Sequence, residues 1–244
     1  PTRLVVCAHA SNICPATLPL AAIGRLCHAH GALFAVDAAQ SAGVLDINME
    51  EMQIDALAVP GHKGLYGPMG VGMLLLGKGI RPDTLLEGGN GLDSLSGGMG
   101  DDLPERYEPG TLPLPAIAGL RAGIEFVRRV TPEAIREKET ALGVFLRDAL
   151  TEVPGVHVAV PHLAGGTVLF RADGVSSEDI AARLDAAGSG ICVRPGFHCA
   201  ALAHRTLGTP EGGAVRASFG WFNTRRDAEQ LIQSLRGGLP GRNG

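Results

Sequence analysis

The sequence places an aspartate and a lysine where two apolar runs end. Asp37 follows the run "ALFAV" within "VDAAQSAG", and Lys63 lies in the glycine-rich stretch "AVPGHKGLYGPMGVG". An unpaired carboxylate is costly to desolvate, so a carboxylate at the end of a buried strand predicts a partner. A carboxylate that keeps a pyridine nitrogen protonated and a lysine that forms a Schiff base are the pair that pyridoxal phosphate requires. The alternative is that Asp37 caps a turn and Lys63 is a solvated loop residue. The glycines around Lys63 favour the cofactor.

A cysteine in the stretch "ICVRPGFHCAALAH" is a candidate nucleophile. Cys199 lies in a glycine-containing turn, where a thiol is accessible, and the neighbouring Arg194 and His198 would favour its thiolate form. A buried structural cysteine is the commoner alternative. A metal site built from Cys192, His198, Cys199 and His204 is a third interpretation, but its spacing matches no usual zinc pattern. The stretch therefore favours a nucleophile, and we expect no metal.

Three strand-like runs must position the first pair of residues. They are "RLVVCAHASN", "ALFAVDAAQ" and "MQIDALAVPGHKG", and a helical stretch that stops at Gly31 separates the first two. Apolar strands that alternate with a helix predict an α/β fold with a mostly parallel sheet. Ligands gather at the carboxyl ends of such strands, and the polar residues found there are Asn12, Asp37, His62 and Lys63.

The rest of the chain divides into a connecting segment, a helical region and a smaller unit. Residues 77–115 are rich in Gly and Pro over a length that indicates a functional or mobile loop. Two helices follow, separated at Thr131, which can cap the second helix, and Pro132, which suits its first position. We therefore expect a partial large domain over 1–130 and a small C-terminal α/β domain over 131–244. The small domain would contain strands at 166–172 and 214–222 and helices at 176–188 (capped by Ser177) and 224–238.

Composition excludes several classes of function. The 244 residues carry a net charge of −4 with no basic stripe, which argues against nucleic acid as a partner. Apolar runs such as "VGMLLLG" are too short to cross a bilayer, and no charged-then-apolar leader is present. Five scattered cysteines do not form a disulfide framework and predict a reducing cytoplasm. Because the chain begins at Pro1, we expect that an N-terminal segment is missing.

A series of motifs resembles one enzyme family over nearly the whole chain. They are "VVCAHASN", "FAVDAAQ", "AVPGHKGLYGPMGVG", "EGGNG", "RYEPGT", "VRPGFHCA" and "VRASFGWFNT", in this order. The sequence is similar to the C-terminal portion of class V aminotransferase-fold enzymes, and most of all to cysteine desulfurases and the related selenocysteine lyases. The resemblance implies the type I fold of pyridoxal phosphate-dependent transferases.

The resemblance also implies roles for individual residues. Lys63 resembles the Schiff-base lysine, and Asp37 the partner of the pyridinium nitrogen. Cys199 resembles the cysteine that takes sulfur from L-cysteine as a persulfide, leaving L-alanine. The remaining positions that match are Gln40 (ring hydroxyl), His62 (phosphate), Asn12 (beside substrate and cofactor), and Arg216 and Arg194 (substrate carboxylate). "EGGNG" resembles a loop that reaches the phosphate of the neighbouring subunit, which implies a homodimer, and a sulfur-acceptor protein is a further implied partner.

Some positions depart from the family pattern. Pro60 replaces a serine that binds phosphate in many relatives, and "SNICPAT" replaces a glycine-containing turn. The segment that precedes "VVCAHASN" in relatives, with its phosphate-binding turn and ring-stacking residue, is absent. Three interpretations stay open: a cysteine desulfurase in the intact protein, a selenocysteine lyase or another enzyme of the same fold, and a truncated, non-catalytic chain.

Overall fold

The computed structural model describes residues 1–91, 97–186, 190–209 and 212–237. The chain forms two compact units. The first unit comprises residues 1–7, 20–39 and 47–129, and the second comprises 8–19, 40–46 and 130–244. Two short segments from the first half of the sequence therefore belong to the second unit.

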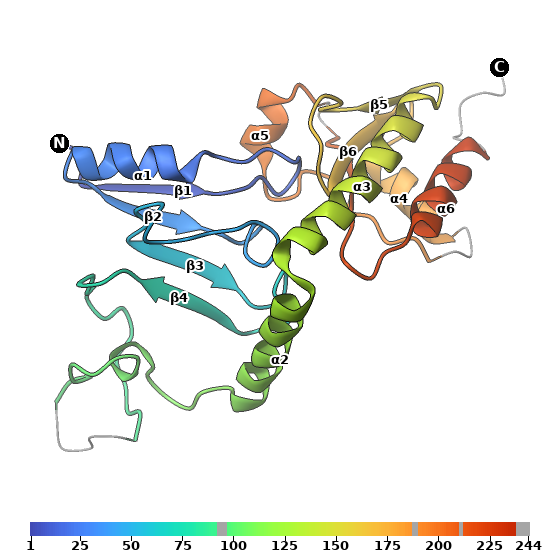
Figure 1. Cartoon of the computed structure of the whole chain (residues 1–244). Coiled ribbons are helices and arrows are strands. Elements are labelled where there is room, and N and C mark those ends of the chain that lie inside the picture. Colours follow the sequence, from blue (N-terminus) through green and yellow to red (C-terminus); the bar gives the residue numbers. More distant parts are fainter. Residues whose placement is uncertain (92–96, 187–189, 210–211, 238–244) are drawn as a thin grey trace. The chain divides into compact units, whose positions relative to one another are not determined.

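A mixed four-stranded sheet forms the centre of the first unit. Its strands are β1 (Leu4–Ala8), β2 (Leu33–Asp37), β3 (Ala56–Pro60) and β4 (Gly72–Leu76), in the order β1-β2-β3-β4. β2 pairs with β3 in parallel, whereas β3 pairs with β4 antiparallel. Figure 1 shows the arrows of β1, β2 and β3 pointing the same way and that of β4 pointing back. The predicted mostly parallel sheet thus has an antiparallel edge strand.

Helix α1 (Leu20–Ala29) packs on this sheet. It ends where the sequence predicts, because Gly31 has a φ of 67°, a left-handed conformation that glycine adopts without strain. Its buried residues include Gly24, where a Cβ atom would collide with the backbone carbonyl of Met52. The side chain of Asp55 accepts hydrogen bonds from the backbone N–H of Phe34 and the ring of His28, and so ties the helix to the start of β2.

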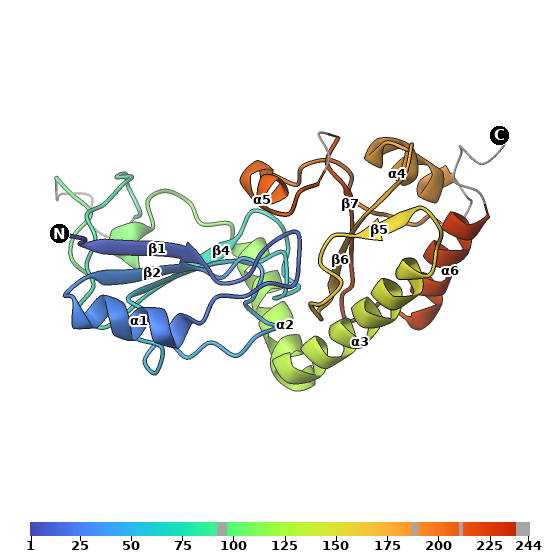
Figure 2. The ribbon, with the colours of Figure 1, turned by 90° about the horizontal axis from the view of Figure 1, so that it is seen from above.

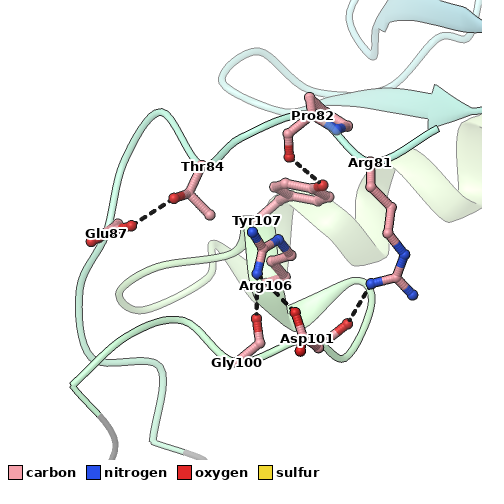
Figure 3. Close-up of polar contacts among 8 residues, drawn as sticks. All are labelled: Arg81, Pro82, Thr84, Glu87, Gly100, Asp101, Arg106 and Tyr107. Atoms are coloured by element: carbon pink, nitrogen blue, oxygen red, sulfur yellow. Dashed lines mark hydrogen bonds and ion pairs between the residues drawn. The ribbon is translucent and has the colours of Figure 1, made fainter.

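The Gly- and Pro-rich segment after β4 is held by polar contacts among its own residues (Figure 3). Arg106 donates to the carbonyl of Gly100 and to the carboxylate of Asp101, and the Tyr107 hydroxyl donates to the carbonyl of Pro82. A single 3₁₀ turn, η1 (Glu105–Tyr107), precedes helix α2 (Leu114–Val130). Part of the predicted loop, residues 92–96, lies outside the described residues.

The second unit is a three-stranded antiparallel sheet covered by helices (Figure 2). Its strands are β5 (Val156–Val158), β6 (Thr167–Ala172) and β7 (Val215–Ser218), in the order β5-β6-β7. Its helices are α3 (Pro132–Thr151), α4 (Ser177–Ala186), α5 (Ala201–Thr206) and α6 (Arg225–Arg236). The ends of two predicted helices, residues 187–188 and 238, lie outside the described residues.

Alternation along β6 explains how this sheet is buried on both faces. Val168 and Phe170 point to the core formed with α3, α4 and α6. Leu169, between them, belongs to a second cluster that contains Ile13 and Cys14 from the segment 8–19. That segment therefore covers the face of the sheet opposite the three helices.

The caps of the helices agree with the sequence at Thr131 but not at Ser177. Thr131 accepts a hydrogen bond from the N–H of Ala134, and Pro132 is the first residue of α3, as predicted. The predicted cap at Ser177 is wrong, because Ser176 accepts from the N–H of Asp179 instead. Ser177 already lies within α4, and its buried hydroxyl accepts from the N–H of Gly196 and lies 2.9 Å from the carbonyl of Gly212.

Candidate functional site

The second unit brings the exposed Cys199 next to Arg194, which pairs with Arg216. We define residues 191–200 as the cysteine loop. Arg194 of this loop forms an antiparallel bridge with Arg216 of β7, in which each backbone N–H donates to the other residue's carbonyl, at 3.0 and 2.8 Å. Residues paired in this way project their side chains from the same face. The Arg194 guanidinium Nη2 lies 3.8 Å from the Cys199 sulfur. A cation at this position stabilises negative charge on a thiol.

The backbone of the cysteine loop is strained at the residue that presents the thiol. His198 and Cys199 have φ values of 55° and 59°, in the left-handed region that side chains disfavour. Such positions cost roughly 1–3 kcal/mol each and occur where the surrounding structure compensates. Here the Ala200 N–H donates to the Phe197 carbonyl at 2.8 Å, and the Asn12 amide donates to the His198 carbonyl at 2.6 Å.

Asn12 also connects the loop to Arg216. The Arg216 Nη1 donates to the backbone carbonyl of Asn12 at 2.7 Å, while the Asn12 side chain holds the loop. Three residues that the sequence analysis proposed from distant motifs (Asn12, Cys199 and Arg216) therefore meet in one place. Arg194 completes this group.

The positive charge at this place is not neutralised within the described part of the chain. There, neither Arg194 nor Arg216 forms an ion pair with a carboxylate, and the buried Nε of Arg216 has no hydrogen-bond partner. Burial lowers the pKa of the Arg216 guanidinium, and the nearby Arg194 lowers it further. Two adjacent guanidinium groups without a counter-ion are suited to binding a carboxylate.

The histidines of the alternative metal interpretation are instead bonded to protein groups. The Nε2 of His198 lies 2.8 Å from the Arg194 carbonyl, and its Nδ1 lies 3.1 Å from Nε2 of His204. Both ring nitrogens of His198 are therefore occupied, which leaves neither for a metal. The Thr209 hydroxyl, which sequence reasoning missed, lies 2.6 Å from the Nδ1 of His204.

In the first unit, Asp37 and Lys63 lie at the ends of two adjacent parallel strands. Asp37 is the last residue of β2 and pairs in register with Ala58 of β3, and Lys63 lies in the turn that follows β3. The carboxylate Oδ1 of Asp37 accepts from the Ala39 N–H at 2.8 Å. Both side chains are exposed, as is that of His62.

The turn that carries Lys63 is held by close backbone contacts. The N–H of Gly67 donates to the Gly61 carbonyl at 2.8 Å, and a Cβ atom at Gly67 would lie 2.9 Å from that oxygen. The Tyr66 N–H donates to the carbonyl of Lys63 itself at 2.9 Å. These glycines therefore fix the lysine turn against the end of β3. Pro60, the last residue of β3, supplies no hydroxyl to this region.

Gln40 belongs to the second unit, where it lines a pocket with a titratable residue that the sequence analysis did not select. The pocket includes Ser11, Thr17 and Arg136, and Glu139 of α3 lies in its wall. Burial raises the pKa of the Glu139 carboxyl from its ordinary value of 4.5 to about 7. No spacing signal in the sequence could have identified Glu139, since it depends on packing between α3 and the residues before β6.

Comparisons with known proteins are consistent with this arrangement. The aminotransferase class-V family model matches residues 1–231. The chain belongs to the aminotransferase class-V family. A probable cysteine desulfurase of Methanothermobacter thermautotrophicus is 35% identical over an alignment of 240 residues, and the match covers 96% of this chain and 60% of the relative. One of Chlamydia trachomatis is 35% identical over 247 residues, covering 59% of its length. The chain thus spans about three fifths of the length of these relatives.

Solved structures show the same class V aminotransferase fold. The apo cysteine desulfurase of Thermococcus onnurineus has a TM-score of 0.83 at 32% identity, and the match covers 96% of this chain and 59% of that structure. The cysteine desulfurase CsdA of Escherichia coli has a TM-score of 0.85 at 28% identity, with 95% and 58% covered. Among the described residues, no helix has the length and apolar character needed to cross a membrane.

Class V aminotransferases in general depend on pyridoxal phosphate, and the first unit has groups that fit this cofactor. Within the described residues, Asp37 uses one carboxylate oxygen in its turn, and the other has no hydrogen-bond partner. The Lys63 amine forms no hydrogen bond or ion pair in that part of the chain. A carboxylate with a free oxygen and a free primary amine, both at the ends of adjacent strands, are the groups needed to bind a pyridinium nitrogen and an aldehyde carbon.

Proposed function

We propose that this chain is part of a pyridoxal phosphate-dependent cysteine desulfurase, which converts L-cysteine to L-alanine and places the sulfur on Cys199. The observation that most supports this is an exposed cysteine beside Arg194, which pairs with Arg216, where neither arginine has a counter-ion among the described residues. The first group is a nucleophile, and the second binds a carboxylate. An enzyme that removes sulfur from an amino acid requires a nucleophile for the sulfur and a binding site for the carboxylate.

Arg216 and Arg194 would hold the substrate carboxylate. The half-buried Arg216 is fixed by its bond to the Asn12 carbonyl, so its guanidinium is oriented before substrate arrives. The more exposed Arg194 would complete the pair and keep positive charge near the Cys199 sulfur. Asn12, held by its bond to the His198 carbonyl, would lie beside both substrate and cofactor.

Four residues would hold the cofactor. Lys63 would bind it covalently, Asp37 would keep its ring nitrogen protonated, Gln40 would approach the ring hydroxyl, and His62 the phosphate. When bound, pyridoxal phosphate supplies an electron sink for charge that develops at the substrate α-carbon. The Lys63 amine would take up the proton that the substrate α-carbon loses.

Cys199 would accept the sulfur. Its thiolate attacks the substrate sulfur, so a sulfur–sulfur bond forms as the bond between Cβ and sulfur breaks. The electron pair of the broken bond remains at Cβ, which takes up a proton and becomes the methyl group of alanine. Cys199 is left as a persulfide. A homodimer and a sulfur-acceptor protein complete the proposal on the basis of family resemblance. A cytoplasmic location is proposed from the five scattered cysteines.

The experiment compares two exposed cysteines. In protein expressed from the complete gene, Cys199→Ser should abolish alanine formation from L-cysteine, and Cys192→Ser should leave it unchanged, because both thiols are exposed but only Cys199 lies beside Arg194. Retained alanine formation in Cys199→Ser would refute the proposal. Turnover of selenocysteine with none of cysteine would favour a selenocysteine lyase instead.

A further inference from the structure

A chain of three side chains runs from the cysteine loop into the protein. His198 and His204 are 4% and 2% exposed, and their rings are stacked with centroids 5.3 Å apart. His198 reaches the Arg194 carbonyl, His204 reaches His198, and the Thr209 hydroxyl reaches His204. No role in the proposed reaction requires His204 or Thr209. Buried polar groups in such a chain must nevertheless all be satisfied.

The bonds at the Arg194 end determine the proton positions along the whole chain. A carbonyl only accepts, so Nε2 of His198 carries a proton, and in the neutral ring Nδ1 is then an acceptor. Nε2 of His204 must therefore donate to it. Nδ1 of a neutral His204 is then an acceptor as well, and the Thr209 hydroxyl donates to it. Each neutral ring is thus held in its Nε2–H tautomer.

The same chain has room for one additional proton. If His204 becomes charged, its Nδ1 donates to the Thr209 oxygen, and the hydroxyl can turn to the His204 carbonyl, 3.1 Å away. A second proton would place two N–H groups against each other across the 3.1 Å between the rings. Burial lowers the pKa of both histidines. The charges of Arg216 and Arg194 lower the pKa of His198 further, whereas its hydrogen bond to the Arg194 carbonyl raises it. The Phe197 carbonyl raises the pKa of His204. The neutral arrangement is therefore the one expected at pH 7.

We propose that His204 is a positioning residue for Cys199, because it fixes the His198 ring and thereby the left-handed backbone that presents the thiol beside Arg194. This inference rests on the proposed function, because the position of Cys199 matters for sulfur transfer. Its tests, however, require no sulfur transfer. His198 and Cys199 both have left-handed backbone, and the His198 ring is the side chain that connects this strained pair to helix α5. Without the bond from His204, Nδ1 of this ring has no other hydrogen-bond partner among the described residues.

The first test measures proton positions directly. In protein expressed from the complete gene with ¹⁵N-labelled histidine, long-range ¹H–¹⁵N spectra at pH 7 should show His198 and His204 as single Nε2–H tautomers. The two signals are assigned by their loss in His198→Asn and His204→Gln. Both Thr209→Val and Thr209→Ser should preserve these tautomers, because the Arg194 carbonyl fixes them from the other end of the chain of side chains. Exchanging tautomers or an Nδ1–H form of His198 in the parent chain would overturn the proposal.

The second test measures the thiol. Iodoacetamide labelling read by mass spectrometry gives the ratio of Cys199 to Cys192 modification, with the exposed Cys192 as an internal reference. Because Cys199 is already exposed, release of the loop adds little access but moves the sulfur away from Arg194. His204→Leu should therefore lower the ratio on the order of fivefold, the effect of one lost buried hydrogen bond. His204→Gln keeps an amide donor at the position of Nε2 and should stay close to the parent.

Two results would overturn the proposal: an unchanged ratio in His204→Leu, or an equal fall in His204→Gln, which would make ring packing the cause. If His204→Leu does not fold, Thr209→Val against Thr209→Ser provides the same comparison, with a smaller fall expected only in Thr209→Val. Equal ratios in these two variants would then contradict the proposal. Labelling requires neither cofactor nor free cysteine. If the ratio falls in His204→Leu but not in His204→Gln, and the protein forms no alanine, the proposed function is refuted while the positioning role of His204 is supported.

Discussion

Glu139 should make the stability of the second unit depend on pH in an unusual direction. Its carboxyl lies in the pocket wall on α3, with Gly166 packed against its Cβ, and among the described residues it has no ion-pair partner. Burial raises its pKa from 4.5 to about 7. The folded state therefore holds a proton that the unfolded state releases in this interval. The contribution of Glu139 to stability is thus fully present below pH 4.5 and is lost as pH rises towards and through 7.

The size of the effect follows from the same two values. At about 1.36 kcal/mol for each pH unit, a rise from 4.5 to about 7 corresponds to at most about 3.4 kcal/mol. Glu139 is only partly buried, and its contact with solvent reduces this to about 1–2 kcal/mol. Glu139→Gln keeps the shape without the charge. It should therefore stabilise the protein by about 1–2 kcal/mol at pH 8.

The assay is urea unfolding at pH 5 and pH 8, in parent chain, Glu139→Gln and Glu137→Gln. The control removes the same charge from an exposed position of the same helix. Glu139→Gln should unfold at higher urea than the parent at pH 8, and this difference should shrink at pH 5. The reasoning is refuted if Glu139→Gln is destabilising at pH 8, or if Glu137→Gln gives the same gain.

Three further substitutions test the packing that positions the site. Thr224→Ala should cost about 1 kcal/mol, because it breaks the capping box of α6, whereas Thr224→Ser should cost little; equal losses in urea unfolding would contradict this. Gly67→Ala should destabilise the first unit and weaken pyridoxal phosphate binding measured by absorbance, whereas Gly97→Ala, in open space, should do neither. Phe170→Ala, at a fully buried position, should cost about 3–5 kcal/mol of unfolding free energy, and a loss below about 1 kcal/mol would show that the core is not where the structure places it.

The sequence predicted the elements with strong local signals. The stop at Gly31 and the break at Thr131 and Pro132 depend on backbone preferences of single residues, and the structure has both. The strands that carry Asp37 and precede Lys63 were recognised by short apolar runs with polar ends. The antiparallel direction of β4 was not foreseen, because strand direction depends on the path of the chain and not on composition.

Features that depend on long-range contacts could not be predicted in this way. Nothing local in the segment 8–19 indicates that Ile13 and Cys14 pack on β6, more than 150 residues later. The cap at Ser177 was placed one residue late, because adjacent serines give equal local signals and the competing contact with Gly196 comes from the cysteine loop. The raised pKa of Glu139 arises from tertiary packing in the same manner.

The most direct test of the account follows the sulfur atom itself. The protein from the complete gene is incubated with pyridoxal phosphate and ³⁵S-labelled L-cysteine, and its peptides are separated without reductant. We predict that the label appears on the peptide that contains Cys199, is released by a thiol reductant, and is absent from the peptide of Cys192, which is also exposed. Label on Cys192 or on no cysteine, in a protein that forms alanine, would contradict the assignment of Cys199 as the sulfur acceptor.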